Sequence, residues 1–411
     1  MTVPSPSPRT ARRTHGFTES VIREMTRVAN EAGAINLAQG FPDFPAPEVI
    51  KEAACEAIRA DINQYAITWG SPRLRRAIAA KYARFYGMDV DEAREITVTC
   101  GATEAAAAAL LSIVDPGDEV IIFEPFYENY GPDAILCDAK PVWVPLPPDG
   151  GVDLDRLAAA FSPRTRAIVL NTPNNPTGHV FTRAELEAVA ELCMHHDVIA
   201  VTDEIYEHIL YDGTHVPLAT LPGMRERTIT ISGLSKTFSI TGWRIGTIVA
   251  PPDLTSAIRK VHDFLTVGAP APLQEGVAAG LELLGDDYYA ALARDYAARR
   301  DVLHTALVDA GFRCTPPQGA YYILADFSAL SELDDVAFSK WLARGGLPEG
   351  EDRGERGEAN GVAPVPGSSF FHDPALGCTL VRFAFCKRIE TLEEAGRRLR
   401  ALKPMLAAAG S

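Results

Sequence analysis

The sequence predicts an α/β protein with a large domain, built on a mainly parallel seven-stranded sheet flanked by helices, and a smaller α+β domain. Three observations support this fold class. From about residue 50, helical patterns alternate with short apolar runs, and near residue 285 this alternation ends. The 411 residues are enough for two domains with sizeable cores. Strand–helix alternation is typical of a parallel sheet with helices on both faces, because parallel strands need long crossover connections.

Helical patterns precede the first strand. Residues 46–62 and 71–87 place apolar side chains at helical spacing. In the second segment Ser71 is a suitable N-cap and Pro72 suits the first helical position, so we expect a helix to begin there. Further helical patterns separate the strands at 102–114 and 182–196.

Seven short runs rich in Val, Ile and Thr are the predicted strands of the large sheet. They are EITVTCG (95–101), EVIIFEP (119–125), KPVWVPL (140–146), TRAIVLNTPNN (165–175), VIAVTDEIY (198–206), TITISG (228–233) and GTIVAPP (246–252).

Beyond residue 285, a helical pattern at 286–311 leads into strand-like segments at 319–327 and 378–385, which indicates an α+β domain. We expect four divisions: a flexible tail at 1–14, a segment at 15–48 that joins the small domain, a large domain at 49–285 and a small domain at 286–411. The acidic run at 347–361 is expected to be a solvated loop, with a lid over the substrate mouth as the alternative.

Composition restricts the classes of partner. The net charge of −15 argues against a nucleic-acid or anionic-membrane surface. Seven scattered cysteines form no CxxC pair and no metal-like spacing with histidine, so we expect reduced thiols in a cytoplasmic protein and no metal site. The first 14 residues lack the apolar core of a signal peptide, and no apolar run is long enough to cross a bilayer.

Several polar or small residues fall at strand ends, where sheets of this kind bind ligands. They are Gly101 to Thr103, Tyr127, Asn175, Asp203, Tyr206 and Lys236. Each has an ordinary alternative explanation, such as a turn or a helix cap. Their agreement across several strands favours a binding site.

The stretch SGLSKTFSITGWRIG, residues 232–246, places Lys236 among small and hydroxyl residues directly after a predicted buried strand. Arg244 adds a second positive charge. Asp203 ends another apolar strand, where a carboxylate needs a cation to offset the loss of water. Tyr206 lies about one helical turn after it and is expected on the same side.

This set of residues matches the needs of pyridoxal 5'-phosphate. A lysine captures its aldehyde as a Schiff base, and a carboxylate keeps its ring nitrogen protonated. Its phosphate needs amides, hydroxyls and a guanidinium. The helix expected to begin near Ala102 offers free N–H groups for an anion.

The chain resembles the class I and II aminotransferases of fold type I, and more narrowly the kynurenine/glutamine/methionine aminotransferase group. The resemblance runs nearly end to end. It rests on INLAQGFPDFPAP, NQYAITWGSPRLRRAIA, FEPFYENY, LNTPNNPTGHVF, VTDEIYEHI, SGLSKTFSITGWRIG, GAYYILADFS, VPGSSF and VRFAFCK, in this order.

The resemblance implies a role for each candidate residue. Lys236 would form the Schiff base and move the α-proton as general acid and base. Asp203 would pair with the pyridinium nitrogen, with Asn175 and Tyr206 as donors to the phenolic oxygen. Tyr127 would stack on the cofactor ring.

The phosphate and substrate roles follow from the same resemblance. Gly101, Ala102, Thr103, Ser235 and Arg244 would hold the phosphate, while Tyr65 would reach the phosphate of a neighbouring subunit. A homodimer with shared active sites is therefore expected. Arg382 would clamp the substrate carboxylate, assisted by Asn171, Asn175 and the backbone of Gly40.

The sequence departs from the family pattern at several positions. Gly233 stands where the family often has a phosphate-binding serine, so either Ser235 or Ser232 replaces it or one phosphate contact is lost. The kynurenine-type enzymes carry an aromatic residue where this chain has Thr103, and another near the position of Ile22. They carry an aromatic–histidine pair where this chain has Val267 and Gly268. Kynurenine is therefore not the expected substrate.

The predicted function is an aminotransferase that moves an amino group from an L-amino acid to a 2-oxo acid by a ping-pong mechanism. The alternative within the same fold is a β-lyase (a C–S lyase), a cyclase or an oxidase. Transfer of nitrogen to a 2-oxo acid, rather than release of ammonia, separates the two. A regulator with a DNA-binding domain is disfavoured, because only about 30 residues precede INLAQGF.

Overall fold

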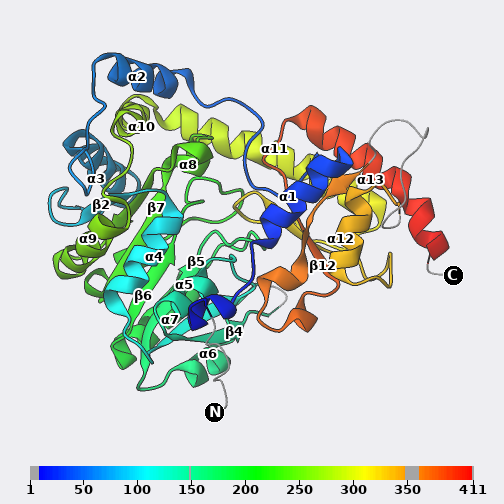
Figure 1. Cartoon of the computed structure of the whole chain (residues 1–411), viewed down its shortest axis with the longest axis horizontal. Helices are drawn as coiled ribbons and strands as arrows, with labels where there is room; N and C mark the ends of the chain where they lie inside the picture. Colours follow the sequence, from blue (N-terminus) through cyan, green and yellow to red (C-terminus); the bar gives the residue numbers. More distant parts are fainter. Residues whose placement is uncertain (1–8, 148–149, 348–360, 410–411) are drawn as a thin grey trace, which may run out of the picture.

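The computed structural model describes residues 9–147, 150–347 and 361–409. Figure 1 shows two parts, a large sheet with its helices on the left and a smaller α+β part on the right. Most of the predicted acidic loop at 347–361 and the first eight residues of the predicted tail lie outside the described residues.

The large sheet contains the seven strands expected from the sequence. They are β2 (Ile96–Thr99), β3 (Glu119–Glu124), β4 (Lys140–Pro145), β5 (Thr165–Asn171), β6 (Ile199–Asp203), β7 (Thr228–Gly233) and β8 (Gly246–Val249). Their order across the sheet is β2-β8-β7-β6-β5-β3-β4. All neighbouring strands are parallel except β8, which is antiparallel to both β2 and β7. The predicted mainly parallel sheet is confirmed.

Alternating side chains along β3 show how this sheet is buried on both faces. Val120 and Ile122 pack with one apolar cluster, whereas Ile121 and Phe123 pack with another. The first cluster includes α4 (Ala102–Ile113), α5 (Tyr130–Leu136) and α9 (Pro252–Thr266). The second includes α6 (Leu154–Ala160) and α7 (Arg183–His196).

The helix expected at residue 71 begins there. The Ser71 hydroxyl accepts a hydrogen bond from the Leu74 N–H at 3.2 Å, and Pro72 occupies the first helical position. Gly87 ends the helix with a φ of 62°. Four helices pack with β2 and β8 in a third apolar cluster. They are α2 (Glu48–Arg59), α3 (Pro72–Tyr86), α8 (Leu234–Thr237) and α10 (Ala271–Leu283).

The smaller part is built on an antiparallel sheet in the order β11-β12-β9. Its strands are β9 (Tyr322–Asp326), β11 (Val365–Pro366) and β12 (Leu380–Ala384). Its helices are α11 (Asp286–Ala310), α12 (Asp335–Ala343) and α13 (Ile389–Ala409). In Figure 1, α11 runs from the large sheet toward this part.

The beginning of the chain returns to this smaller part. Strand β1 (Ile35–Asn36) pairs in parallel with β10 (Val362–Ala363). Helix α1 (Val21–Ala32) shares an apolar cluster with Ala363 of β10 and with Ala34 and Ala38, which flank β1. The short 3-10 turns are η1 (Arg12–His15), η2 (Leu218–Thr220), η3 (Arg225–Arg227), η4 (Thr241–Trp243), η5 (Gly367–Phe370) and η6 (Pro374–Leu376).

All seven cysteines belong to the described part of the chain and none forms a disulfide. Within the same residues, no helix combines the length and apolar character needed to span a bilayer.

Candidate active site

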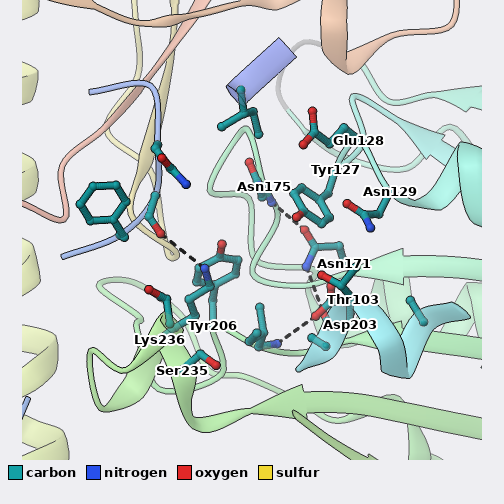
Figure 2. Close-up of a pocket in the computed structure, with 18 of the residues that line it drawn as sticks. Thr103, Tyr127, Glu128, Asn129, Asn171, Asn175, Asp203, Tyr206, Ser235 and Lys236 are labelled. Carbon is teal, nitrogen blue, oxygen red and sulfur yellow. Dashed lines mark hydrogen bonds between the residues drawn. The ribbon is translucent and has the colours of Figure 1, made fainter. Parts of the chain in front are cut away.

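A cavity of about 480 Å³ opens beyond the carboxyl ends of the adjacent strands β3, β5, β6 and β7 (Figure 2). Twelve of the fourteen candidate residues line it: Gly40, Ala102, Thr103, Tyr127, Asn171, Asn175, Asp203, Tyr206, Ser235, Lys236, Arg244 and Arg382. Gly101 lies directly before Ala102, behind this wall. Tyr65 does not line the cavity and is 88% exposed.

Lys236 is carried into the cavity by the short helix α8, which follows the end of β7. Its Nζ lies 3.4 Å from the carbonyl oxygen of Gly40 and 5.9 Å from the centre of the Tyr206 ring. Burial lowers the pKa of Lys236 to about 8, although nearby Asp203 opposes this shift. The amine is therefore partly neutral near physiological pH, as a nucleophile or general base must be.

Asp203 is the last residue of β6, and its carboxylate is buried. The Tyr130 hydroxyl donates to its Oδ2 at 2.8 Å, and the Ile205 N–H donates to its Oδ1 at 3.2 Å. Burial raises the pKa of Asp203 to about 6, while the bond from Tyr130 holds that pKa down. The carboxylate remains charged at neutral pH in a place that favours a cationic partner.

A second contact from β5 stabilises the backbone of Asp203. The Asn171 side chain donates to the Asp203 carbonyl oxygen at 2.9 Å, and the Asn175 N–H donates to the Asn171 Oδ1 at 2.7 Å. Figure 2 shows Asn175 above Asn171, with a dashed line joining the two residues. The Pro-rich loop after β5 is thereby held against the end of β6.

Arg382 is 1% exposed and comes from β12 of the smaller part. Its guanidinium donates to Asn175 Oδ1 and to the Ala38 carbonyl oxygen, both at 2.7 Å, and lies 4.2 Å from the centre of the Tyr322 ring. Its Nε–H is buried and has no hydrogen-bond partner among the residues of the described ranges. A carboxylate in the cavity would supply an acceptor to this group.

Three tyrosines cluster at the wall next to Lys236, and two of them, Tyr206 and Tyr322, line the cavity. The hydroxyls of Tyr206 and Tyr322 lie 3.1 Å apart, and the Tyr321 hydroxyl donates to the Gly40 carbonyl oxygen at 2.8 Å. This second bond connects Gly40, which lies between β1 and α2, to the segment that begins β9. The wall therefore joins the two parts of the molecule.

The opposite corner combines an arginine with the start of a helix. Gly101 has a φ of +85°, and α4 begins at Ala102. Arg244 donates to the Thr241 and Cys100 carbonyl oxygens at 3.1 and 3.4 Å. The φ of Gly101 strains any other residue, and a Cβ atom there would lie 2.3 Å from a guanidinium nitrogen of Arg244 and displace that side chain. Free N–H groups and a guanidinium in one corner suit a phosphate.

The two serines proposed to replace the missing family serine lie in different places. Ser235 lines the cavity. Ser232 instead donates to Glu207 Oε1 at 2.5 Å, in a buried cluster behind the cavity. Of the two, Ser235 is the one available to a ligand.

The Glu207 cluster supports the turn that follows Asp203. Glu207 is 3% exposed and also accepts hydrogen bonds from Lys81 Nζ, at 2.5 Å, and from the Tyr86 hydroxyl. Burial disfavours the charged carboxylate, but Lys81 outweighs this effect and lowers the pKa of Glu207 to about 2. The contacts join α3, the turn after β6 and the end of β7.

Sequence reasoning did not single out several lining residues: Ser20, Arg23, Gln39, Phe41, Ala106, Glu128, Asn129, Tyr130, Ile205, Thr241, Gly242 and Tyr322. Most belong to the sequence blocks on which the family resemblance rests, but they carry no local signal of their own. Tyr130 is the exception, because it falls three residues after Tyr127 in FYENY, at the helical spacing that places two side chains on one side.

Comparison with known proteins matches residues 32–346 to the family described as Aminotransferase class I and II. A probable N-succinyldiaminopimelate aminotransferase DapC of Mycobacterium tuberculosis is 43% identical over 406 residues, or 96% of this chain and 98% of the relative. The solved structure of N-succinyldiaminopimelate aminotransferase from this organism has a TM-score of 0.89 and 42% identity, and the match covers 96% of this chain and 100% of that chain.

Two further relatives have different printed activities. The methionine aminotransferase of Escherichia coli (strain K12) is 38% identical over 93% of this chain and 96% of its own length. Kynurenine–oxoglutarate transaminase 1 of Homo sapiens is 36% identical over 96% of this chain and 98% of its own length.

Proposed function

The chain belongs to the class I and II aminotransferase family, and from this premise we propose that Lys236, Asp203 and Arg382 carry its reaction. It is an enzyme of fold type I that depends on pyridoxal 5'-phosphate and moves an amino group from an amino acid to a 2-oxo acid. These predictions from the sequence are confirmed. One observation carries the residue assignment: a lysine of lowered pKa, a buried carboxylate and a buried arginine line the same cavity.

When bound, the cofactor supplies an electron sink for the negative charge that develops at the substrate α-carbon. We propose that Lys236 attaches it covalently and that Asp203 pairs with its protonated ring nitrogen. Arg382 donates a hydrogen bond to the side-chain Oδ1 of Asn175. The side-chain NH2 group of Asn175 is therefore left to donate to the phenolic oxygen of the cofactor. Tyr206 would be a second donor there, and Tyr127 would stack on the ring.

The phosphate would lie in the corner formed by Arg244 and the first turn of α4. The proposed ligands are the backbone amides at Gly101, Ala102 and Thr103, the Thr103 and Ser235 hydroxyls and the Arg244 guanidinium. This assignment is supported by the helix N-terminus and by the missing side chain at Gly101, which gives Arg244 its place.

Arg382 would bind the α-carboxylate of the substrate, because its Nε–H lacks a partner while its other nitrogens are held in place. This anchor, assisted by Asn171 and Gly40, would orient the Cα–H bond toward Lys236. The freed Lys236 amine would be placed to accept the α-proton of the substrate and to donate a proton back on the cofactor side of the transferred nitrogen. Its pKa of about 8 suits both directions of transfer.

A polar cavity wall supports a polar or flexible donor amino acid. Thr103, Glu128 and Asn129 line the cavity together with Ile22. The hydroxyl of Ser20, directly before α1, donates to Glu128 Oε1 at 2.7 Å. The relatives named above act on N-succinyldiaminopimelate, methionine or kynurenine according to their names. We propose that this chain does not favour kynurenine, because the aromatic residues expected for that substrate are absent from positions 22, 103, 267 and 268.

We propose that the enzyme is a homodimer with shared sites, in which Tyr65 reaches the phosphate bound by the partner subunit. Tyr65 is 88% exposed and Phe264 is 92% exposed, while Ile67, Leu265 and Val267 are also exposed apolar residues. Such a group of apolar side chains is unusual on a free surface. We also propose the domain division at residues 49 and 285 and a cytoplasmic location, which the seven free thiols support.

Absorbance of the purified enzyme tests this proposal. We expect a cofactor band that a donor amino acid bleaches and a 2-oxo acid restores, with one molecule of new amino acid formed for each donor consumed. In Lys236→Ala the covalent form should be absent. Release of ammonia without return of the band would instead favour a lyase, cyclase or oxidase. Lack of any bound cofactor would overturn the role of Lys236.

A further inference from the structure

His262 is a buried histidine of α9 that lies outside the cavity. Both of its ring nitrogens contact oxygen acceptors. Nδ1 lies 2.8 Å from Glu104 Oε1, and Nε2 lies 2.7 Å from the Thr68 carbonyl oxygen. The residue thus connects α9 with the first turn of α4 and with the segment between α2 and α3.

These two contacts favour the protonated form of the ring. A neutral imidazole has one N–H group, so one of its nitrogens would present a lone pair to an oxygen acceptor. Only the imidazolium donates at both positions. A buried cation is costly unless it is paired, and the carboxylate of Glu104 provides that pair.

Glu104 transmits this contact to the corner that holds Arg244. Its second oxygen, Oε2, accepts a hydrogen bond from the Cys100 N–H at 2.8 Å. Cys100 directly precedes Gly101, and its carbonyl oxygen accepts from Arg244 at 3.4 Å. The peptide groups on both sides of Cys100 are therefore held, one by Glu104 and one by Arg244.

We propose that His262, as an imidazolium, is a positioning residue for the cofactor phosphate. It holds Glu104, and Glu104 holds the turn from Cys100 to Gly101, whose orientation directs the first N–H groups of α4 into the cavity. This inference rests on the proposed function, because that proposal assigns the phosphate to this turn.

The charge of His262 makes this support depend on pH. The titratable groups around it are Glu104 from α4, Asp263 on α9 itself and the Cys100 thiol, which connects to it through Thr266. Burial by itself lowers the pKa of His262, but the bonds to Glu104 and Thr68 outweigh burial and raise it. Protonated His262 therefore holds Glu104 fully at pH values below the ordinary histidine pKa. This contact is lost as the pH rises through the raised pKa of His262.

Two substitutions separate the contacts of the ring. In His262→Asn the amide nitrogen can take the place of Nδ1 and keep the bond to Glu104. In His262→Gln it can take the place of Nε2, which keeps the bond to Thr68 and leaves Glu104 without its partner. The probe is pyridoxamine 5'-phosphate, which has no aldehyde and therefore reports the phosphate site without covalent capture by Lys236.

At pH 6.5 we expect His262→Gln to raise the Kd of this probe about tenfold, and His262→Asn to raise it by less than about threefold. The ratio of the His262→Gln and wild-type Kd values should approach one as the pH rises and wild-type His262 loses its proton. In Glu104→Gln, a neutral His262 can satisfy both contacts, so that variant should lose this pH dependence and remain within about threefold of the wild type at pH 6.5.

Equal losses in the Asn and Gln variants, or a Gln variant that binds like the wild type, would overturn the inference. If the His262 variants do not fold, the Glu104→Gln titration decides the question, together with the ring nitrogen NMR shifts of wild-type His262. A neutral ring at pH 6.5 would also refute the proposal. Wild-type enzyme that does not bind the probe would instead refute the proposed phosphate site.

Discussion

The hydrogen bond from Tyr130 to Asp203 allows a quantitative prediction. Tyr130→Phe removes one hydroxyl, which donates to the buried Asp203 Oδ2 at 2.8 Å, and keeps the aromatic ring. A hydrogen bond to a charged group contributes about 1.5–3 kcal/mol. Since one pH unit corresponds to about 1.4 kcal/mol, the pKa of Asp203 should rise by about 1 to 2 pH units above its value near 6.

The consequence is a change in the pH range over which the protein binds its cofactor. The protonated ring nitrogen needs an ionised Asp203, so affinity for pyridoxal 5'-phosphate in the wild type should fall as the pH drops below about 6. In Tyr130→Phe the same fall should begin about 1 to 2 pH units higher. Affinity is measured by titrating the cofactor-free enzyme and following the absorbance of the bound cofactor from pH 5 to pH 9.

Tyr82→Phe is the matched control. Tyr82 is also a fully buried tyrosine of the large part, but its hydroxyl has no hydrogen-bond partner within the described chain and it does not line the cavity. This variant should keep the wild-type pH profile. If Tyr130→Phe binds the cofactor with an unchanged profile, Tyr130 does not hold the charge of Asp203 and the reasoning is refuted.

Three further predictions concern other parts of the site. Gly101→Ala should raise the cofactor Kd at least about tenfold in a binding titration, because alanine is strained at a φ of +85° and its Cβ atom, 2.3 Å from the Arg244 guanidinium, would displace that group. Unchanged affinity would show that the turn adjusts freely. Arg382→Lys should lower kcat/KM about a hundredfold in steady-state assays, because lysine cannot reproduce the planar, fixed guanidinium group. A loss of less than about tenfold would argue against Arg382 as the residue that binds the substrate carboxylate. Glu207→Gln should lower the free energy of unfolding by about 3 kcal/mol in urea titrations, because it removes the carboxylate that pairs with the buried Lys81. A loss of less than about 1 kcal/mol would show that this ion pair does not stabilise the fold.

The local features of this fold could be predicted well. Each strand of the large sheet is a short run of apolar and β-branched residues, and such runs form strands because their side chains pack on both faces of a pleated sheet. The helix at Ser71 has its cap and its Pro72 in the sequence itself. The two-residue strands β1 and β10 were not predicted, because they pair residues from opposite ends of the chain and have no local pattern.

The members of the site could be predicted for a related reason. Residues that follow parallel strands meet at one edge of the sheet, so Asp203 and Lys236 were expected together once the strands were recognised. The contacts among them could not be predicted. Arg382 binds Asn175 across 207 positions of sequence, and Tyr130 binds Asp203 across 73.

Sequence order thus determined the sheet, the start of the capped helix and the set of residues at the strand ends, because each depends on neighbouring residues and on alternating burial. Tertiary structure decided which donor meets which acceptor. Ser235 lines the cavity whereas Ser232 binds Glu207, and the His262 ring lies between Glu104 and the Thr68 carbonyl oxygen. These choices depend on distances of a few ångströms between distant segments, and hydrogen bonds and pKa values respond to such distances while sequence patterns do not.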